Sequence, residues 1–321
     1  MHYSVALLAS VVLLSTSFAR VLPKVKRDNS TCCGYKLTNR GNTRFRYQHI
    51  IDFSTMTSLD QVYQAGWGIA DGWQSGGSNP NTGQYTIARE SNVKPVRGQG
   101  LTLTVPGGQD PKAGTFSGAE ITFPYKVLGG YFEVEAKVTS VPGTVFGMFT
   151  MHGDPWDAPI GWQDEQDIEI LSPSLMTPSP YNAAGIQLTN HHPSTGQMFE
   201  TVAPFPADPS TAFHKYSISW LPSLSCPALN QPGSNTKYRY DGVLLNSPTN
   251  GYSKNPSEFY INLWTNADPY FSAGPPTADA VVTIKQIRVW YDTPNKVADG
   301  ACPTKNTFDC TVAMACPVEV F

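Results

Sequence analysis

The fold class of this chain is decided by the stretch Gly129-Gly-Tyr-Phe-Glu-Val-Glu-Ala-Lys-Val-Thr-Ser-Val-Pro-Gly-Thr-Val-Phe-Gly-Met-Phe-Thr-Met151. Its first half, Tyr131–Val138, alternates apolar with polar residues, as a β-strand with one buried face does. Its second half, Thr144–Met151, is rich in the β-branched and aromatic residues that strands favour. Gly129-Gly130 and Pro142-Gly143 are pairs typical of turns. The stretch therefore predicts two short strands bounded by turns.

Runs of the same kind recur along the chain with further turn signals between them. They are Leu101–Val105, Tyr216–Trp220, Tyr238–Tyr240, Phe259–Leu263, Val281–Ile284 and Ile287–Tyr291. Helical periodicity is nearly absent, and we expect one helical turn, at Leu59–Tyr63. Many short strands separated by turns predict an all-β sandwich or barrel. Because no repeat or linker divides the chain, we expect one such domain over residues 28–293.

The composition fits this class and excludes others. The 321 residues include 22 Lys and Arg against 25 Asp and Glu, a formal net charge of −3. Charged residues make up 15% of the chain, whereas an average soluble protein has about 25%. The 27 Gly, the 27 Pro and the 12% aromatic content disfavour a helical bundle, a coiled coil or a disordered chain. A nearly neutral chain without a basic stripe also argues against a nucleic-acid partner.

The N-terminal region is typical of a secreted protein. The apolar run Val5–Leu14 and the small residues of Ser17-Phe18-Ala19 predict a signal peptide over residues 1–19, rather than a membrane span or an apolar first strand. Lys26-Arg27 either ends a pro-segment over residues 20–27 or is a chance basic pair. No second apolar run is long enough to cross a membrane. We therefore expect an extracellular protein that can associate with the cell wall and has no membrane partner.

The cysteines suit the same compartment. Six is an even number, which permits up to three disulfides and 15 pairings. Five of them lie near the ends and one lies between: Cys32, Cys33, Cys302, Cys310, Cys316 and Cys226. We expect disulfides that staple the termini, with residues 294–321 forming a cysteine-containing tail. The alternative is a zinc site, for which the chain lacks paired Cys-x-x-Cys motifs.

The candidate chemistry lies in Gln163-Asp-Glu-Gln-Asp-Ile-Glu-Ile-Leu171. Glu165, Asp167 and Glu169 stand two residues apart, so on a strand all three point to one face. Like charges at that spacing cannot all stay ionised cheaply, so at least one carboxyl is expected to have a raised pKa. A protonated acid beside an ionised carboxylate, about 5 Å apart, is what a retaining glycosidase uses.

Two other interpretations of the acidic strand stay open. The carboxylates could form a solvated acidic edge, or they could bind a divalent cation. Ile168 and Ile170 alternate with the acids and indicate that the opposite face is buried, which argues against an exposed edge. The spacing alone does not decide which glutamate would attack and which would carry the proton.

Here a family resemblance adds to the argument. Glu165-Gln-Asp-Ile-Glu169 resembles the Glu-x-Asp-x-Glu signature of glycoside hydrolase family 16. Further blocks resemble that family in the same order, over about residues 45–292: Asn92-Val93 with Leu101–Val105, Gly129–Lys137, Phe213–Tyr216 with Trp220, Tyr240–Gly242, Ile261–Trp264 and Ile287–Tyr291. The resemblance implies a concanavalin A-like β-jelly roll, a sandwich of two antiparallel sheets.

The resemblance also implies roles for the acids. Glu165 would be the nucleophile, Glu169 the general acid/base and Asp167 the assisting carboxylate of a double displacement with net retention. The short form of the signature is similar to lichenase-like, xyloglucan-active and fungal wall-crosslinking branches. It therefore implies a secreted endo-β-glycosidase acting on a cell-wall polysaccharide, with a β-glucan as the expected substrate. A transglycosylase that uses the same residues is the alternative.

A second alternative is a lectin-like binder on the same sandwich that has lost its chemistry. The intact acids argue against it, because a pure binder does not need them. We expect a monomer without a cofactor or metal site, although the family allows a structural calcium ion.

Sugar contacts are expected from residues in or beside the family's cleft segments. The aromatic candidates are Trp162, Trp264, Tyr270 and Phe271, and the polar candidates are Asn190 and His191. Core packing is the alternative for each aromatic residue, and metal binding or plain exposure is the alternative for His191. Gln166 stands where the family usually has an aliphatic residue, so its buried amide should need hydrogen-bond partners.

Overall fold

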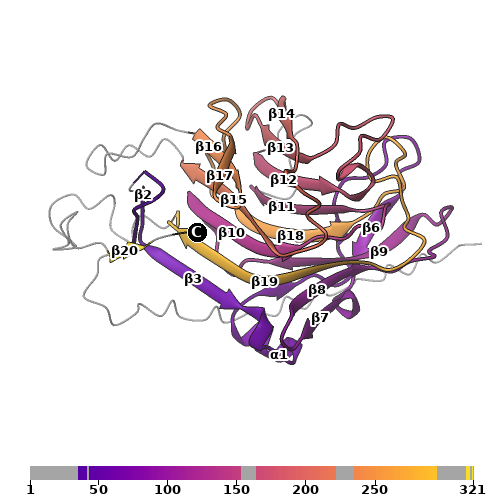
Figure 1. Cartoon of the computed structure of the whole chain (residues 1–321), viewed down its shortest axis with the longest axis horizontal. Coiled ribbons are helices and arrows are strands. Elements are labelled where there is room, and N and C mark those ends of the chain that lie inside the picture. The colour runs from indigo at the N-terminus through magenta and orange to yellow at the C-terminus, as the bar shows by residue number, and fades with distance from the viewer. Residues whose placement is uncertain are drawn as a thin grey trace, which may run out of the picture.

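Strands make up nearly all the regular structure of the computed structural model, which describes residues 35–41, 43–152, 164–221, 235–294, 316–318 and 320. Two large sheets lie one over the other, and a small sheet lies to one side of them (Figure 1). This arrangement confirms the predicted all-β jelly-roll sandwich. Helical structure in the described part is limited to α1 (Leu59–Gln64), where the helical turn was predicted, and three 3₁₀ turns: Phe53–Thr55, Glu90–Asn92 and Ser172–Ser174.

The first large sheet has eight described strands. Its order is β17 (Val243–Asn246), β16 (Asn235–Tyr240), β15 (His214–Leu221), β10 (Gly130–Lys137), β19 (Ala280–Tyr291), β8 (Gly100–Val105) and β7 (Val93–Val96), with β3 (Tyr47–Asp52) pairing β19 beside β8. Every pairing in this sheet is antiparallel.

The second large sheet has nine described strands. Its order is β14 (Met198–Ala203), β13 (Ile186–His191), β12 (Glu165–Leu171), β11 (Val145–Met151), β18 (Glu258–Trp264), β9 (Thr115–Thr122), β6 (Tyr85–Ala88) and β5 (Gln74–Ser75), with β4 (Gly68–Ile69) pairing β9. Its pairings are antiparallel except that of β6 with β9, which departs from the expected purely antiparallel sheet.

The core lies between these two sheets and follows the strand alternation. Phe132 and Val134 of β10 contribute one side, and Ile168 and Ile170 of β12 contribute the other. The second sheet therefore has one face buried in the core, and its other face is available for a site.

The strand β19 joins two runs that the sequence presents separately. Ile284 and Ile287 are both fully buried although they are three residues apart, which breaks the alternation of a regular strand. The register against β10 shifts at this point, with Gln286 opposite Glu135 and Ile284 opposite Ala136. Lys285 is therefore the extra residue of a β-bulge, which restores the inward direction for the second run.

A third sheet packs against one end of the outer face of the first. Its order is β2 (Thr43–Phe45), β1 (Tyr35–Leu37) and β20 (Cys316–Val318), and β20 runs parallel to β1. Leu37, Phe45 and Val320 pack with Tyr131 and Trp290, which point away from the main core. The two ends of the described chain therefore meet on this face.

Several predictions fall outside the described residues. These include the signal peptide at 1–19, the pro-segment at 20–27 and five of the six cysteines. The disulfide staples and the domain bounds 28–293 therefore stay predictions. No helix in the described part of the chain is long and apolar enough to span a membrane.

Candidate active site

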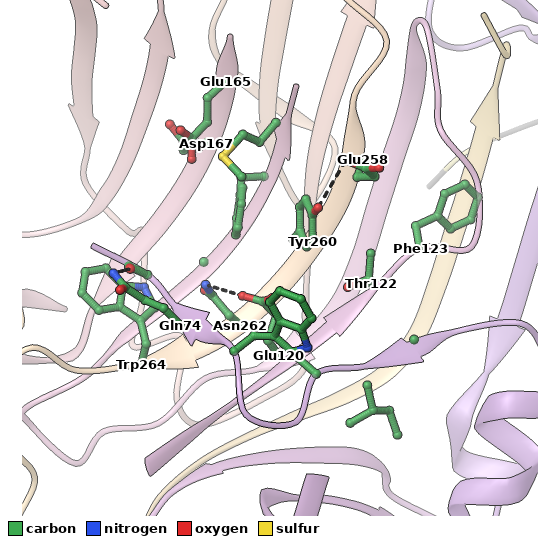
Figure 2. A pocket seen from close by; sticks show the side chains of 18 of the residues that line it. Gln74, Glu120, Thr122, Phe123, Glu165, Asp167, Glu258, Tyr260, Asn262 and Trp264 are labelled. Carbon is green, nitrogen blue, oxygen red and sulfur yellow. Dashed lines mark hydrogen bonds between the residues drawn. The ribbon is translucent and has the colours of Figure 1, made fainter. Parts of the chain in front are cut away.

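The exposed face of the second sheet carries a cleft of about 1060 Å³. Its floor is formed by β9, β11, β12 and β18, and one wall is formed by the segment 66–78 (Figure 2). This volume is at the upper end of the roughly 300–1,000 Å³ typical of sites for small ligands. The lining extends across four strands, which suits an extended ligand.

The antiparallel register aligns side chains in rows across the cleft floor. In one row, Glu169 of β12 lies opposite Gly147 of β11, Gly147 opposite Asn262 of β18, and Asn262 opposite Glu120 of β9. The neighbouring row contains Asp167, Phe149, Tyr260 and Thr122. All eight residues line the cleft. Each row spans four strands, so neighbouring strands supply side chains about 4.8 Å apart.

The three acids of β12 are brought together as their spacing predicts. Glu165, Asp167 and Glu169 all line the cleft, whereas Ile168 and Ile170 between and beyond them are buried in the core. Figure 2 shows Glu165 and Asp167 side by side on this strand. The opposite face of the strand is buried, so the register of β12 fixes all three acids on the cleft side.

Gln166 lies on the core face of β12 and is fully buried. Its amide nitrogen donates to Thr150 Oγ1 at 3.2 Å, and its amide oxygen accepts a hydrogen bond from the Thr236 hydroxyl. The predicted need for partners is therefore met by threonines from both sheets.

Burial dominates the electrostatics of the acids. Burial, followed by the charges of Glu165 and Glu200, raises the pKa of Glu169 to about 8. Burial, followed by the charge of Glu169, also raises the pKa of Asp167 well above its usual range, whereas a hydrogen bond with Glu165 lowers it. The predicted raised pKa is thus present at two of the three acids, and its main cause is burial rather than like charge.

His191 lies beside the acids, in contact with Asp167. The distance from His191 Nε2 to Asp167 Oδ2 is 3.0 Å. Burial lowers the pKa of His191, although the Glu165 charge opposes this effect. Burial disfavours the charged form of both groups, and the contact is a hydrogen bond between His191 and Asp167.

The same residues are the place where a metal ion could bind. Glu165, Asp167 and His191 each offer one ligand atom, and these atoms lie within 4.8 Å of one another. The direct contact between Asp167 and His191 accounts for this closeness without an ion. Divalent-cation binding thus stays an alternative for the group and is not needed to explain its geometry.

The aromatic candidates occupy different places. Trp264 lines the cleft, but it is almost buried, because the Gly76 backbone covers one part of its ring system and Phe271 packs against it with ring centroids 5.9 Å apart. Phe271 therefore supports Trp264 and does not line the cleft itself. Tyr270 is exposed outside the cleft. Trp162 lies outside the described residues.

Asn190 does not reach the cleft. It lies opposite Gln166 in the register of β12 with β13, so its side chain shares the core face of the sheet with Gln166. It is fully buried and is held by Thr236 Oγ1, by the Asn250 carbonyl and by the Tyr238 hydroxyl. The prediction that Asn190 contacts sugar is therefore wrong. Side chains alternate between the two faces of a strand, and the position of Asn190 in β13 places its side chain on the core face, where it forms internal hydrogen bonds.

The structure adds cleft residues that sequence reasoning missed. Glu120 accepts hydrogen bonds from Ser75 Oγ at 2.8 Å and Asn262 Nδ2 at 3.4 Å, the second of which is drawn in Figure 2. Burial raises the pKa of Glu120 to about 7. Trp73, 71% exposed, stands at the cleft wall. Glu120 has no acidic neighbour in the sequence to mark it, and Trp73 lies in a loop whose position depends on the fold.

Asp164, immediately before Glu165, anchors the start of the acidic strand. Its buried carboxylate accepts hydrogen bonds from the backbone N–H groups of Lys254 and Asn255 at 3.1 and 2.9 Å, and from the Asn255 side chain at 2.7 Å. These bonds tie β12 to the segment that leads into β18. The acid next to Glu165 therefore has a structural role in placing Glu165.

Comparisons with known proteins agree with this geometry. The family model described as "Glycosyl hydrolases family 16" matches residues 81–281, more than half of the chain. Among solved structures, a β-glucanase of Bacillus licheniformis is similar at 21% identity and a TM-score of 0.56, over 77% of this chain and 98% of that chain.

Two further solved structures are similar in the same way. A prokaryotic β-1,3-1,4-glucanase (lichenase) from a mouse hindgut metagenome has 22% identity and a TM-score of 0.55, over 77% of this chain and 99% of that chain. An endo-β-1,3-glucanase from Pyrococcus furiosus has 17% identity and a TM-score of 0.55, over 81% and 98%. At these identities the similarity shows a shared fold. No curated protein sequence matches the chain significantly.

Proposed function

Because this chain belongs to family 16 of the glycosyl hydrolases, we propose that it is a secreted retaining endo-β-glycosidase that cleaves a cell-wall β-glucan by double displacement. The observation that carries the proposal is the pairing of Glu165 with Glu169, whose raised pKa of about 8 keeps it protonated at neutral pH, on one face of β12 inside an open cleft. A proton donor and a second carboxylate on one cleft face are what this reaction requires.

In the first step, a Glu165 carboxylate oxygen attacks the anomeric carbon of a bound sugar. The bond from that carbon to the leaving sugar's oxygen breaks, and Glu169 gives its proton to that oxygen. The products of the step are a glycosyl ester on Glu165 and a shortened chain with a new hydroxyl. Burial of Glu169 supports this role, because it keeps the proton available at neutral pH.

In the second step, Glu169 has become a carboxylate and takes a proton from water. The water oxygen attacks the anomeric carbon, the ester bond breaks, and Glu165 leaves as a carboxylate. Asp167 is placed to orient Glu165 in both steps, because the two side chains are hydrogen-bonded. His191 in turn orients Asp167 through their 3.0 Å contact.

The cleft supports a neutral polymer as substrate. It is open on one side of the sheet and offers hydrogen-bonding groups, such as Gln74 and Asn262, beside aromatic ones, such as Trp73 and Tyr260. Its charged lining residues are five acids and one base: Glu120, Glu165, Asp167, Glu169, Glu258 and Lys126. Burial raises the pKa of Glu120, Asp167 and Glu169, and Lys126 pairs with Glu258 at 3.3 Å. The lining therefore carries little net charge, which suits a neutral glucan. The three similar solved structures described above are glucanases.

The test is the release of reducing ends from separate β-1,3-, β-1,3/1,4- and β-1,4-glucans, with a galactan alongside. We expect release from at least one β-glucan and none from the galactan. Glu165→Gln should lower the rate by about three orders of magnitude or more, because it removes the nucleophile. The matched control is Asp60→Asn, which removes an exposed acid of α1 and should leave the rate unchanged.

The same assay separates the alternatives. Addition of oligosaccharide acceptors distinguishes hydrolysis from glycosyl transfer by the size of the products. Binding to a polymer without release or transfer on any polymer would contradict the enzyme and favour the lectin-like alternative.

A further inference from the structure

Two exposed tyrosines stand against each other outside the cleft. Tyr181 follows β12 in the connection to β13, and Tyr270 lies in the loop after β18. Their ring centroids are 4.4 Å apart at an interplanar angle of 62°. The side chains are 56% and 53% exposed, so most of this pair faces water. Neither hydroxyl makes a hydrogen bond to another described residue.

The pair is held in place by the backbone around it. Asn182 Nδ2 donates to the Tyr270 carbonyl at 2.8 Å, which ties the two loops together. Ser179 Oγ accepts from the backbone N–H of Asn182 at 2.9 Å, and Asp268 Oδ1 accepts from that of Tyr270 at 2.9 Å. The loops thus hold two large aromatic rings exposed in one arrangement. Binding a ligand would therefore cost less conformational entropy than ordering two mobile side chains would.

The pair is continuous with the cleft through two aromatic residues. Phe271 follows Tyr270 and packs on Trp264, and Trp264 lines the cleft beyond Glu169. In the strand register, Trp264 and Leu171 both lie opposite Val145. Trp264 therefore lies in the row next to that of Glu169. The loop that carries Tyr270 is therefore anchored at the Trp264 end of the cleft.

We propose that Tyr181 and Tyr270 form an accessory binding site for a β-glucan chain whose other part occupies the cleft. The chemistry that fits is the apolar C–H face of a pyranose ring, which packs on exposed aromatic surface while its hydroxyls stay in water or bond the tyrosine hydroxyls. Exposed aromatic surface of this kind marks interaction sites in soluble proteins. The inference rests on the proposed function for the identity of the polymer, and it adds a site that acts on long chains only.

The test measures polymer binding without turnover. Glu165→Gln protein is run through gels that contain soluble mixed-linkage β-glucan or soluble β-1,3-glucan, and the dissociation constant is obtained from the retardation at several polymer concentrations. In this background, Tyr181→Ala/Tyr270→Ala should raise the dissociation constant for the bound polymer by about threefold to tenfold, the loss expected for an aromatic contact. Tyr181→Phe/Tyr270→Phe should retain most of the affinity, because the rings remain.

Val243→Ala is the matched control, since Val243 is an exposed apolar residue of β17 in the other large sheet. It should bind both polymers as the parent does. Equal dissociation constants for the parent and the double alanine variant, or failure of both polymers to retard the parent, would overturn the accessory site.

Measurements of turnover distinguish failure of the accessory site from failure of the proposed function. With Glu165 intact, the ratio of KM for the polymer to KM for a tetrasaccharide should rise in the double alanine variant, because a short chain cannot reach both sites. An unchanged ratio in an enzyme that cleaves both substrates would overturn the accessory site and leave the proposed function in place.

Discussion

In the proposed mechanism, Glu169 must hold a proton at neutral pH and release it within one reaction step. Burial is the first cause of its raised pKa, and the charges of Glu165 and Glu200 are the second and third. The protonated form is needed for the first step, so kcat/KM should fall as pH rises through about 8, the pKa of Glu169.

Glu200 provides a way to test this cause without touching the reacting groups. It is an exposed residue of β14, and its charge raises the pKa of Glu169. Glu200→Gln should therefore move the alkaline limb of the profile of kcat/KM against pH toward lower pH. Asp60→Asn is the control for loss of one exposed charge elsewhere. An alkaline limb that stays in place in Glu200→Gln would mean that another group sets it.

At this scale the sequence predicts the acids well and their surroundings poorly. The two-residue spacing of Glu165, Asp167 and Glu169 suffices because a strand turns equal spacing into one face. The same alternation decides which face of the sheet Asn190 occupies. That face depends on the register of β13 against β12, which sequence spacing does not reveal. Glu120 was missed for the same reason, since only the register across β11 and β18 places it in the row of Glu169.

At the scale of elements, the four-strand rows explain how separate strands make one cleft floor. Gly147 of β11 is the smallest member of its row and lies between Glu169 and Asn262. A Cβ atom at this position would lie 2.5 Å from Asn262 Oδ1, which is too close for any real contact. The absence of a side chain therefore lets Asn262 reach Glu120 across the floor of the cleft.

Gly147→Ala should displace Asn262 and lower kcat/KM for the polymer by about tenfold, because small displacements of positioning groups are costly in catalysis. The measurement is steady-state kinetics on the β-glucan that the unmodified protein cleaves. Gly114→Ala is the matched control, because a Cβ atom there would meet nothing within 4 Å. If Gly147→Ala kept the full kcat/KM, the tight packing of this row would have no part in function.

The elements themselves were largely predictable where alternation is long. The runs at Tyr131–Val138 and Thr144–Met151 correspond to β10 and β11 within one residue at each end. The exceptions have physical reasons. Alternation broken by the bulge at Lys285 concealed the continuity of β19, and strands of three residues such as β1 and β20 are too short to show a period.

At the scale of the whole molecule, buried titratable groups should limit the pH range of stability from both sides. On the acid side the relevant group is His49 of β3, which accepts a hydrogen bond from Trp67 Nε1 at 3.1 Å. Burial lowers the pKa of His49 to about 4 from the usual 6.5. The folded state thus binds this proton less readily than the unfolded state, so stability is lost as pH falls from about 6.5 to 4.

The loss from His49 amounts to about 3 kcal/mol in the free energy of unfolding at the acid end of that range. His49→Gln keeps an acceptor for Trp67 but has no proton to bind, so the slope of unfolding free energy against pH between 4 and 6.5 should become shallower. Denaturant titrations at several pH values measure this slope. Parallel curves for the two proteins would contradict the assignment.

On the alkaline side, the raised pKa values of Glu120 and Glu169 have the opposite sign. Their folded-state pKa values, about 7 and about 8, lie above the usual 4.5, so the folded state binds these protons more readily. Their contribution to stability is full below about pH 4.5 and is lost as pH rises through 7 and 8. These two buried acids of the cleft therefore make the fold less stable in alkali.

We propose that Glu165 and Glu169 act in two successive displacements at one anomeric carbon. The sharpest test is ¹H NMR of the β-glucan cleaved by this protein, recorded in the first minutes before the anomers interconvert. The first sugar released should have the β configuration at its new reducing end, because two inversions restore the original one. First release of the α anomer would show a single displacement and would exclude the proposed mechanism.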